Sequence, residues 1–336
     1  MKEKIKELWK LCFNDSEEFI ELYFGMRYKN KINIAIESGD EVISALQMIP
    51  YPMTFCDKRI PTSYISGACT HPDFRNRGVM QQLLSQAFAR MAQNGIYLST
   101  LIPAENWLFD YYAQLGYVPV FRYSTQKINL TRSVPSPETT VGIQSGYQEE
   151  VYSYLDKKLS GHPFCVQHTA EDFRVIMASL SIDNGTLFVA RTNNGISGIA
   201  ITEKREGRII IQELLSDNKN AEYNLLHAIR QHSGCDRILR ILPPDDRSAQ
   251  YTLGMARIIN AKEMLQLYAS CFPKEEMQIE LSDKQLSFNN GYYYLNNGKC
   301  MSSAKRLSGS HLALTIGELT EKIFAASRPY MSLMLN

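Results

Sequence analysis

The chain has 336 residues, of which 44% are hydrophobic, and a formal net charge of +1 at pH 7. This length predicts two or three domains, and the balance of 36 basic and 35 acidic residues argues against a surface built for nucleic acid or an anionic membrane. No apolar run approaches the roughly 20 residues that span a bilayer, and the charged start does not resemble a signal peptide. Seven scattered cysteines without a CxxC pair predict reduced thiols in a cytoplasmic protein.

The first 130 residues are expected to form an α/β unit with the element order ααβββαβαβ. Apolar residues at helical spacing predict a helix over 2–13, and candidate N-caps precede a second helix. Alternating apolar residues then predict a hairpin and a third strand that ends at Thr70. A helix follows from Gly78, and strand, helix and strand complete the unit over 96–130.

Residues 131–140, rich in Pro, Ser and Thr, are expected to lead into a second unit, which spans 131–272. A capping-box pattern at 169–172 predicts a helix, and the order β-β-β-α-β that follows repeats the pattern of the first unit. The second unit reads SDNKNA where the first reads FRNRGV, so the arginines and the glycine of the first unit are missing.

Residues 273–336 are expected to form a third, smaller domain. Asn-Gly turns predict two or three short strands, and the segment 312–325 predicts a helix. The tail has no charged side chain after Arg328, which is typical of a buried segment rather than of a free one.

A basic loop, RNRG at 75–78, separates an apolar strand from an amphipathic helix. The first turn of a helix has unpaired N–H groups and a partial positive charge, so it favours anions such as phosphate. Gly78 would let the backbone approach a ligand closely, and Arg75 and Arg77 could add charge-assisted hydrogen bonds. The pattern therefore predicts a pyrophosphate site, with a solvated basic turn as the alternative.

Residues 63–123 resemble the core of the GNAT superfamily, the acetyl-CoA-dependent N-acetyltransferases. The R-x-x-G part of its loop motif is matched by Arg75, Asn76, Arg77 and Gly78. The usual later Gly or Ala is Met80 here, which departs from the motif.

A longer pattern, T-x-P-x-x-R-x-R-G-V at 70–79, resembles the enhanced-intracellular-survival type of this superfamily. That type has two tandem GNAT units, the second without a working cofactor loop, and a sterol-carrier-protein-like domain at the C-terminal end. The resemblance therefore implies an α/β (α+β) fold with tandem GNAT-like mixed-sheet domains and a small sterol-carrier-like α+β domain. The implied catalytic unit is 1–130, the degenerate unit 131–272 and the sterol-carrier-like domain 273–336.

The same resemblance implies the cofactor contacts. Backbone groups of Ala68, Cys69 and Thr70 would pair with the pantetheine arm and polarise the thioester carbonyl. The pyrophosphate would be held by the loop and the start of its helix, which comprise Arg75, Asn76, Arg77, Gly78, Val79 and Met80. Asn106 would lie beside the pantetheine arm, whereas Trp107 is expected to be a packing residue.

The resemblance also implies the catalytic groups. A Y-x-x-x-G-Y segment is matched by Tyr112, Gly116 and Tyr117, so Tyr112 is the candidate general acid that protonates the leaving thiolate. The alternative is a core aromatic residue, and Tyr111 is the neighbour most easily confused with it. The implied base is the α-carboxylate of Asn336, carried back into the first unit by the apolar tail, with a tail that only packs as the alternative.

Cys69 is expected to be a small buried residue rather than a nucleophile, because no His or acid stands at an activating spacing. The histidines form no metal pattern. The sequence thus predicts an acyltransferase that moves an acetyl group from acetyl-CoA, without a metal, to a primary amine by direct attack. The acceptor would be a polyamine, an antibiotic amine or a lysine side chain, with no nucleic acid or membrane partner and with a homo-oligomer implied. The alternatives are a CoA- or lipid-binding module without catalysis and an acyltransferase that uses a longer acyl-CoA.

Overall fold

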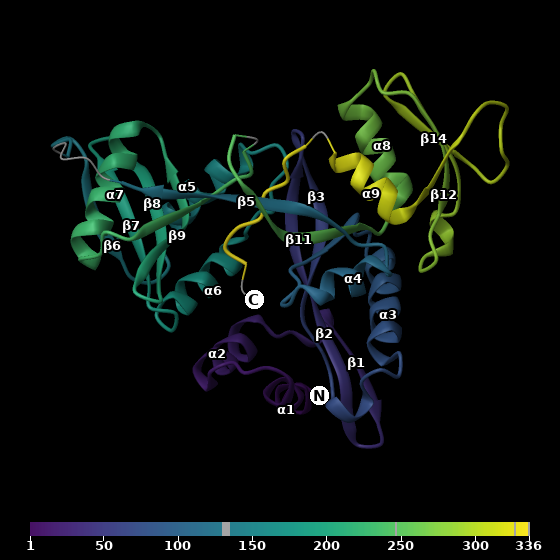
Figure 1. The fold of residues 1–336 in the computed structure, drawn as a ribbon, viewed down its shortest axis with the longest axis horizontal. Coiled ribbons are helices and arrows are strands. Elements are labelled where there is room, and N and C mark those ends of the chain that lie inside the picture. Colours follow the sequence, from purple (N-terminus) through teal and green to yellow (C-terminus); the bar gives the residue numbers. More distant parts are fainter. Residues whose placement is uncertain (130–134, 246, 326, 335–336) are drawn as a thin grey trace.

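A computed structural model describes residues 1–129, 135–245, 247–325 and 327–334. Among these residues, eleven strands form one mixed sheet and four strands form a second, smaller sheet. Figure 1 shows the large sheet running through the centre of the molecule, with the smaller sheet at the upper right. No helix in these ranges is long and apolar enough to cross a membrane.

The first unit has the element order that the sequence predicts. Its bounds are α1 (Lys2–Cys12), α2 (Glu17–Leu22), a π-helical turn (Tyr23–Arg27), a 3-10 turn (Asn30–Ile32), β1 (Asn33–Ser38), β2 (Glu41–Phe55), β3 (Lys58–Thr70), a 3-10 turn (Pro72–Phe74), α3 (Val79–Gln93), β4 (Leu98–Leu101), α4 (Trp107–Ala113) and β5 (Val118–Ile128). The predicted cap of the second helix is also confirmed, because the Ser16 side chain accepts a hydrogen bond from the Phe19 N–H at 3.2 Å.

The second unit contains the predicted helix with its capping box at Thr169 and Asp172, followed by the predicted three strands, helix and strand. It also contains elements that the sequence analysis did not predict, namely β6, α5 and β11. Its bounds are β6 (Thr140–Gln144), α5 (Glu149–Ser160), α6 (Ala170–Leu180), β7 (Gly185–Thr192), β8 (Gly195–Arg205), β9 (Arg208–Ser216), α7 (Lys219–Ser233), β10 (Ile238–Leu242) and β11 (Gln250–Ile258).

The two units share strands. The sheet order is β1-β2-β3-β4-β11-β5-β10-β9-β8-β7-β6, so β11 lies between β4 and β5 of the first unit and is antiparallel to both. On its other side β5 pairs with β10 of the second unit. Figure 1 shows β5 and β11 extending across the middle of the molecule between the two units. The last five residues of β11 are buried. The insertion of β11 between β4 and β5 therefore contributes apolar surface to the core of the first unit.

The remaining elements are α8 (Ala261–Cys271), β12 (Met277–Ser282), a 3-10 turn (Ser287–Asn289), β13 (Gly291–Asn296), β14 (Lys299–Ser303), β15 (Leu312–Thr315) and α9 (Ile316–Phe324). The helix predicted over 312–325 is therefore wrong in its first turn, where β15 pairs in parallel with β12. Thr315 explains the change, because it is the extended N-cap of α9 and forms a capping box with Glu318. An N-cap residue has extended backbone angles and so ends a strand as naturally as it begins a helix.

A buried ion pair joins the first unit to the small sheet. Arg257 on β11 donates to the Asp283 carboxylate at 2.6 Å, and both side chains are fully buried. The same guanidinium donates to the Leu115 carbonyl at 2.8 Å and lies over the Phe88 ring. These contacts satisfy the buried charge, which is the condition under which a buried ion pair is tolerated.

Candidate active site

The predicted loop does lead directly into the N-terminus of a long helix. Gly78 is the N-cap of α3 with a left-handed backbone (φ 75°), and Asn76 is also left-handed (φ 58°). Apart from Gly78 and its two chain neighbours, no atom of the described residues lies within 4 Å of the position that a Cβ on Gly78 would occupy. The first N–H groups of α3, including those of Val79 and Met80, therefore face an open space at the positive end of the helix dipole.

The two arginines of the loop are exposed and carry unneutralised charge. Arg75 folds back, and its Nε donates to the Thr70 carbonyl at 3.1 Å. Arg77 lies over the ring of Phe74, with 5.5 Å between the guanidinium carbon and the ring centroid. Within the described ranges neither arginine forms an ion pair with a carboxylate, so both remain available to an anion.

A bulge in β3 opens the sheet beside this loop. Ala45 pairs with Cys69 and Gln47 pairs with Ser66, so β3 has one extra residue at this point. The extra residue coincides with Gly67, whose φ is +60° and whose Cβ, if present, would overlap the ring of Trp9. A bulge of this kind bends a strand and increases its twist.

The bend separates β3 from its parallel neighbour. The ladder between the two strands covers only Thr62–Tyr64 of β3 and Leu98–Thr100 of β4, although β3 continues to Thr70. The end of β3 therefore has an unpaired edge toward β4. The sequence analysis missed this bulge, although a glycine inside a strand pattern is a recognised signal for one.

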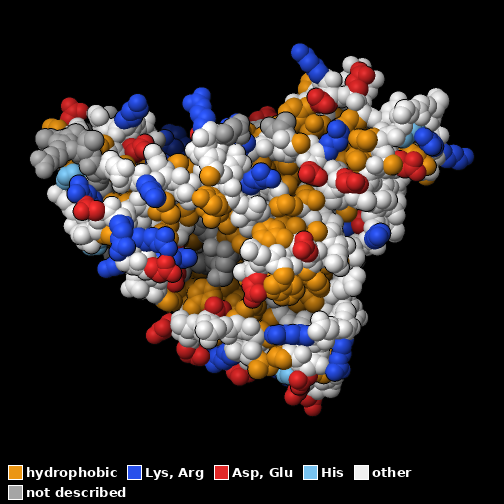
Figure 2. Space-filling view, viewed as in Figure 1, with side chains coloured by type: hydrophobic (Ala, Val, Ile, Leu, Met, Phe, Trp, Pro, Cys, Tyr) orange, Lys and Arg blue, Asp and Glu red, His pale blue; other side chains and the backbone are white. Residues whose placement is uncertain are grey.

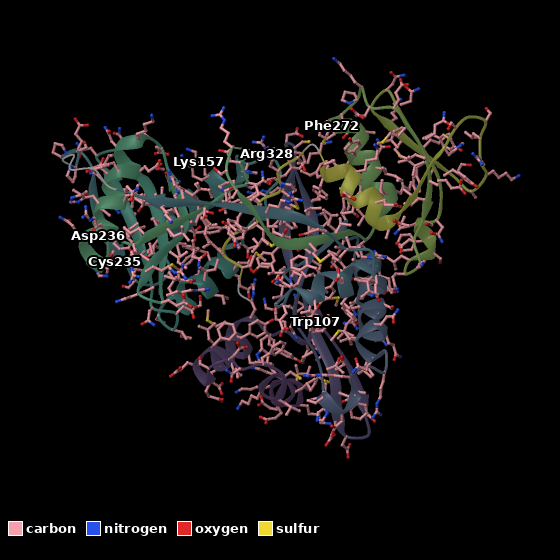
Figure 3. All side chains as sticks on the ribbon, in the orientation of Figure 1. Trp107, Lys157, Cys235, Asp236, Phe272 and Arg328 are labelled. Atoms are coloured by element: carbon pink, nitrogen blue, oxygen red, sulfur yellow. The ribbon has the colours of Figure 1, made fainter. Side chains whose placement is uncertain are left out.

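Ala68, Cys69 and Thr70 lie at this end of β3, which pairs with β2 on one edge and is unpaired on the edge toward β4. The Cys69 carbonyl already accepts from the Ser44 hydroxyl at 2.8 Å, and the Thr70 carbonyl accepts from Arg75. Polarising a thioester carbonyl requires a donor, so the backbone N–H groups are the relevant ones here. Asn106 is the exposed N-cap residue of α4, and Trp107 beside it is 61% exposed at the start of that helix rather than packed in the core (Figure 3). The packing role expected for Trp107 is therefore wrong.

Tyr112 is buried on α4 among aromatic rings. The centroid of its ring lies 5.4 Å from that of Tyr111 and 5.7 Å from that of Tyr117. Burial raises the pKa of Tyr112, so its hydroxyl keeps its proton at neutral pH. That hydroxyl forms no hydrogen bond with any other described residue, whereas the Tyr117 hydroxyl pairs with Ser99 at 2.6 Å. Tyr112 thus lies where a core aromatic residue would lie, and its hydroxyl donates no hydrogen bond to a described residue.

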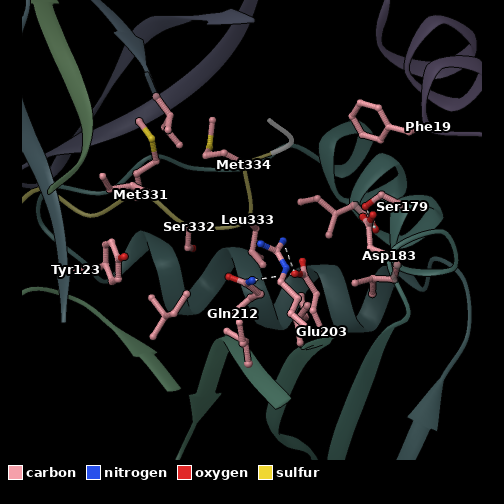
Figure 4. Close-up of a pocket in the computed structure, with 18 of the residues that line it drawn as sticks. Phe19, Tyr123, Ser179, Asp183, Glu203, Gln212, Met331, Ser332, Leu333 and Met334 are labelled. Carbon is pink, nitrogen blue, oxygen red and sulfur yellow. Dashed lines mark hydrogen bonds and ion pairs between the residues drawn. The ribbon is translucent and has the colours of Figure 1, made fainter. Parts of the chain in front are cut away.

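A cavity of about 660 Å³ lies between the first unit, the second unit and the C-terminal tail. Figure 2 shows a hollow with hydrophobic side chains below it and charged side chains on its left, and Figure 4 shows the tail crossing one side of the cavity. It begins at Ile102, directly after β4, and Phe19 lines another side.

The second unit supplies polar groups to the wall of this cavity. Glu203 accepts from Gln212 at 3.0 Å and pairs with Arg205 at 2.6 Å. The Asp183 carboxylate has no hydrogen bond or ion pair with the described part of the chain. Asp183 is an exposed residue of the wall. Partial burial of its carboxylate and then the charge of Glu203 raise the pKa of Asp183, whereas Arg205 lowers it. A cationic ligand would offset the repulsion between the two carboxylates.

The C-terminal tail is held against the second unit by a buried carboxylate. Tyr330 adds to the chain at 164–166 through two backbone hydrogen bonds of 2.8 and 3.0 Å. Glu213 on β9 accepts from the Tyr330 hydroxyl at 2.9 Å and from the Ser332 hydroxyl at 2.7 Å. His168 contacts the Ser332 carbonyl at 2.9 Å. Sequence reasoning missed Glu213, although a single acid in the apolar strand RIIIQELL was a usable signal.

Residues 331–334 of the tail line the cavity, and Figure 4 shows Met331 and Met334 facing it. Asn336, the candidate base, lies outside the described residues. The described part of the tail, which ends at residue 334, therefore reaches the cavity wall.

The second unit has no comparable anion site at the equivalent point. Asn218 caps α7 by accepting from the Ala221 N–H at 2.9 Å, so one of the first N–H groups is already paired. Asp217 places a negative charge beside it and pairs with Lys158 at 2.7 Å. Across the described ranges, no group of three or more His, Cys, Asp or Glu residues could hold a metal ion.

Comparisons with known proteins agree with this geometry. Residues 2–120 match the acetyltransferase (GNAT) domain family. A search of curated proteins finds no match. Several solved structures share the fold over nearly the whole chain. A GCN5-related N-acetyltransferase from Kribbella flavida has 15% identity and a TM-score of 0.77, covering 99% of this chain and 95% of its own.

Two further structures extend this likeness. A probable N-acyltransferase from Enterococcus faecalis has 18% identity and a TM-score of 0.77, covering 97% of this chain and 90% of its own. Eis1 from Mycobacterium abscessus has 12% identity and a TM-score of 0.71, covering 94% of this chain and 85% of its own. At these identities the likeness concerns the fold. The predicted fold class, with GNAT-like domains in mixed sheets, is confirmed. The match of residues 2–120 to an acetyltransferase domain agrees with the predicted enzyme class, a GNAT-type acyltransferase, for that part of the chain.

Proposed function

We propose that this acyltransferase moves the acetyl group of acetyl-CoA to a primary amine by direct attack. Three features of the first unit and its borders support the proposal: the basic loop before α3, the open edge of β3 and the cavity lined by Ile102 directly after β4. In that order they match the pyrophosphate, the pantetheine arm and the reacting thioester of one extended cofactor. A binding module for an apolar ligand would need neither the loop nor the open edge.

In the proposed reaction a neutral amine attacks the thioester carbonyl, and the tetrahedral intermediate then expels the CoA thiolate. Tyr112 is the proposed acid, because its hydroxyl retains its proton and has no hydrogen-bond partner among the described residues. Backbone N–H groups at 68–70 would stabilise the oxyanion.

We also propose that the α-carboxylate of Asn336 accepts the proton of the attacking amine. The support is indirect: the contacts of Glu213 and His168 direct the tail along the cavity wall up to Met334. A carboxylate that follows two residues later would be within reach of the cavity, because two extended residues span about 7 Å.

The proposed acceptor is a small molecule with at least two amino groups. A cavity of about 660 Å³ lies in the usual size range of small-molecule sites. Asp183 offers an unpaired carboxylate to an ammonium group, while a second amine of the same molecule would have to be neutral to react. This favours a polyamine or an amino-bearing antibiotic over a lysine on a folded protein.

Three finer proposals accompany this one. The small sheet β12–β15, packed with α8 and α9, is the proposed sterol-carrier-like domain. The proposed location is the cytoplasm, on the basis of the scattered cysteines. The proposed assembly is a homo-oligomer without nucleic acid or membrane partners, to be measured by light scattering.

The loop can be tested by calorimetric titration of acetyl-CoA. Arg75→Ala should weaken binding roughly 10- to 100-fold, because a charge-assisted hydrogen bond contributes about 1.5–3 kcal/mol. The matched control is Lys219→Ala, which removes a cation from the start of α7 in the second unit and should leave the affinity unchanged. Equal affinities for all three proteins, or no binding at all, would overturn the proposed cofactor site.

Turnover is then followed as release of the CoA thiol with a panel of amines and acyl donors. Diamines should react faster than monoamines of the same length, and acetyl-CoA should be preferred to longer acyl-CoA. Binding without turnover of any amine would support the non-catalytic alternative, and a preference for long chains would support the other acyltransferase.

A further inference from the structure

Two thiols meet beside the proposed phosphate loop. Cys12 ends α1 and is half-buried, and Cys69 lies near the end of β3 with 5% of its surface exposed. Both belong to the same apolar cluster around Trp9. The Cys12 sulfur lies 3.4 Å from the Thr70 carbonyl oxygen, the same oxygen that accepts from Arg75 Nε at 3.1 Å. One carbonyl therefore holds the Cys12 sulfur and the Arg75 guanidinium close together.

The surroundings of Cys12 favour its thiolate. A hydrogen bond from the Cys69 thiol lowers the pKa of Cys12 most, and the Arg75 guanidinium and His71 lower it further, against the opposing effect of burial. When protonated, Cys12 can donate to the Thr70 carbonyl; when ionised, it accepts from Cys69. The hydrogen bond to Cys12 and burial both raise the pKa of Cys69, so that thiol stays protonated. An activated thiolate beside a neutral thiol is the arrangement of a nucleophilic cysteine and its resolving partner.

A second pair of neighbouring thiols offers an internal comparison. Cys56 in the β2–β3 turn lies next to Cys271 at the end of α8. Here burial, the neighbouring Cys271 thiol and Asp57 together raise the pKa of Cys56 to about 12, against the opposing effect of Lys58. In both pairs the two thiols are neighbours, but only the surroundings of Cys12 favour a thiolate.

We propose that Cys12 and Cys69 form an oxidation-sensitive dithiol site that closes into a disulfide beside the phosphate loop. With hydrogen peroxide as the oxidant, the Cys12 thiolate attacks one peroxide oxygen, giving a sulfenic acid and hydroxide. The Cys69 sulfur then attacks the Cys12 sulfur and loses its proton, the S–S bond forms and the sulfenic oxygen leaves as water. Overall, two thiols are oxidised and one peroxide is reduced to two water molecules.

The disulfide would also weaken binding of the cofactor. This consequence rests on the proposed function. Closing the bond removes the Cys12 contact with the Thr70 carbonyl and pulls on the β3 end that carries the proposed pantetheine groups. Arg75 shares that carbonyl, so the loop is expected to shift as well. Oxidised protein should therefore bind acetyl-CoA more weakly than reduced protein.

The chemistry is tested first on the full chain without any cofactor. The protein is treated with hydrogen peroxide, the remaining thiols are alkylated, and the peptides are followed by mass spectrometry over time. The Cys12–Cys69 disulfide should form at least ten times faster than the Cys56–Cys271 disulfide, and Arg75→Ala should slow it. Equal rates for the two pairs, or no Cys12–Cys69 product, would overturn the proposal.

A second measurement uses only the reduced wild type, so its result does not depend on whether a variant folds. In the reduced wild type, alkylation of Cys12 should reach half its maximal rate below pH 8, whereas alkylation of Cys56 should still be rising at pH 9. A Cys12 rate that rises in parallel with that of Cys56 would contradict an activated thiolate.

The second arm titrates acetyl-CoA into reduced and oxidised protein, with Cys12→Ser as the control that should bind equally before and after peroxide. A disulfide with no acetyl-CoA binding by either form would leave the dithiol site standing and overturn the proposed function. Acetyl-CoA binding without a disulfide would support the proposed cofactor site and overturn the dithiol site. A disulfide with unchanged affinity would overturn the link between the two.

Discussion

Tyr112 and Tyr117 belong to one aromatic cluster and differ in what their hydroxyl groups contact. Tyr117 is paired with Ser99, and its ring packs near Phe88, so it serves the core. Tyr112 is also buried, with 8% of its surface exposed against 0% for Tyr117, and its hydroxyl has no partner among the described residues. At this scale the question is whether the hydroxyl of Tyr112 or only its ring matters.

Tyr112→Phe separates these two roles, because it keeps the ring and removes the acid. We expect kcat to fall about 10²- to 10⁴-fold, the usual contribution of a general acid, with little change in thermal stability because no hydrogen bond is lost. Tyr111→Phe is the matched control on the neighbouring residue. An unchanged kcat for Tyr112→Phe, measured by release of the CoA thiol, would show that Tyr112 is only a core aromatic residue.

At the scale of the element, β3 decides the geometry of the site. Its bulge at Gly67 opens the edge that faces β4, and the left-handed loop at 76–78 then turns the chain into α3. If the β2–β3 hairpin lacked this bulge, β3 would stay straight beside its parallel neighbour β4. The edge between them would then leave no place for an extended ligand.

Gly67→Ala should therefore be costly. A left-handed backbone costs a non-glycine residue about 1–2 kcal/mol, and the new Cβ would overlap the Trp9 ring, which adds about 1–3 kcal/mol of overpacking. Gly95→Ala is the matched control, since Gly95 has a φ of +69° but open space around its Cβ position. Urea unfolding should show a larger loss for Gly67→Ala, and equal losses would mean that contact with Trp9 does not set the bulge.

At the scale of the whole molecule, long-range contacts assemble the site from all parts of the chain. Glu213 of the second unit anchors the tail, and Arg257 on β11 anchors the small sheet. Arg27, near the start of the chain, forms a buried ion pair with Asp172 on α6. These contacts hold the two units, the tail and the small sheet together, and the cavity lies where the two units and the tail meet.

Removing the anchor should free the tail. Glu213→Ala leaves two buried hydroxyl groups without an acceptor, at a cost of about 1–3 kcal/mol each, so limited proteolysis should cut the segment 329–334 faster than in the wild type. If the tail carries the proposed base, kcat should fall as well. Tail cleavage at the wild-type rate would mean that backbone pairing of Tyr330 alone holds it.

Glu213→Gln is the control, because it keeps an acceptor for both hydroxyl groups, and it also gives a pH test. Burial raises the pKa of Glu213 above its ordinary value of 4.5, so its contribution to stability is fully present below pH 4.5 and is lost as the pH rises through the raised pKa. The wild type should therefore gain stability relative to Glu213→Gln as the pH falls from 7 toward 4.5 in urea unfolding. Parallel curves would contradict the raised pKa.

The sequence by itself determined the local structure. Alternation, helical spacing and caps predicted the element order of the first unit, the capping box at Thr169 and the loop that leads into α3. These features depend on residues within a few positions of one another, so a local pattern contains them. The same reasoning misplaced the start of α9 at Leu312, because the N-cap Thr315 also ends a strand that pairs with a distant partner.

Only the tertiary structure decided which segments meet. Cys12 reaches the Thr70 carbonyl across 58 positions and Tyr330 reaches Glu213 across 117, and β11 enters the sheet beside β4, about 150 positions earlier in the chain. No local pattern encodes such partners, because packing of apolar surfaces selects them over the whole chain. The basic loop could therefore be predicted from its residues, whereas the open strand edge, the anchored tail and the cavity could not.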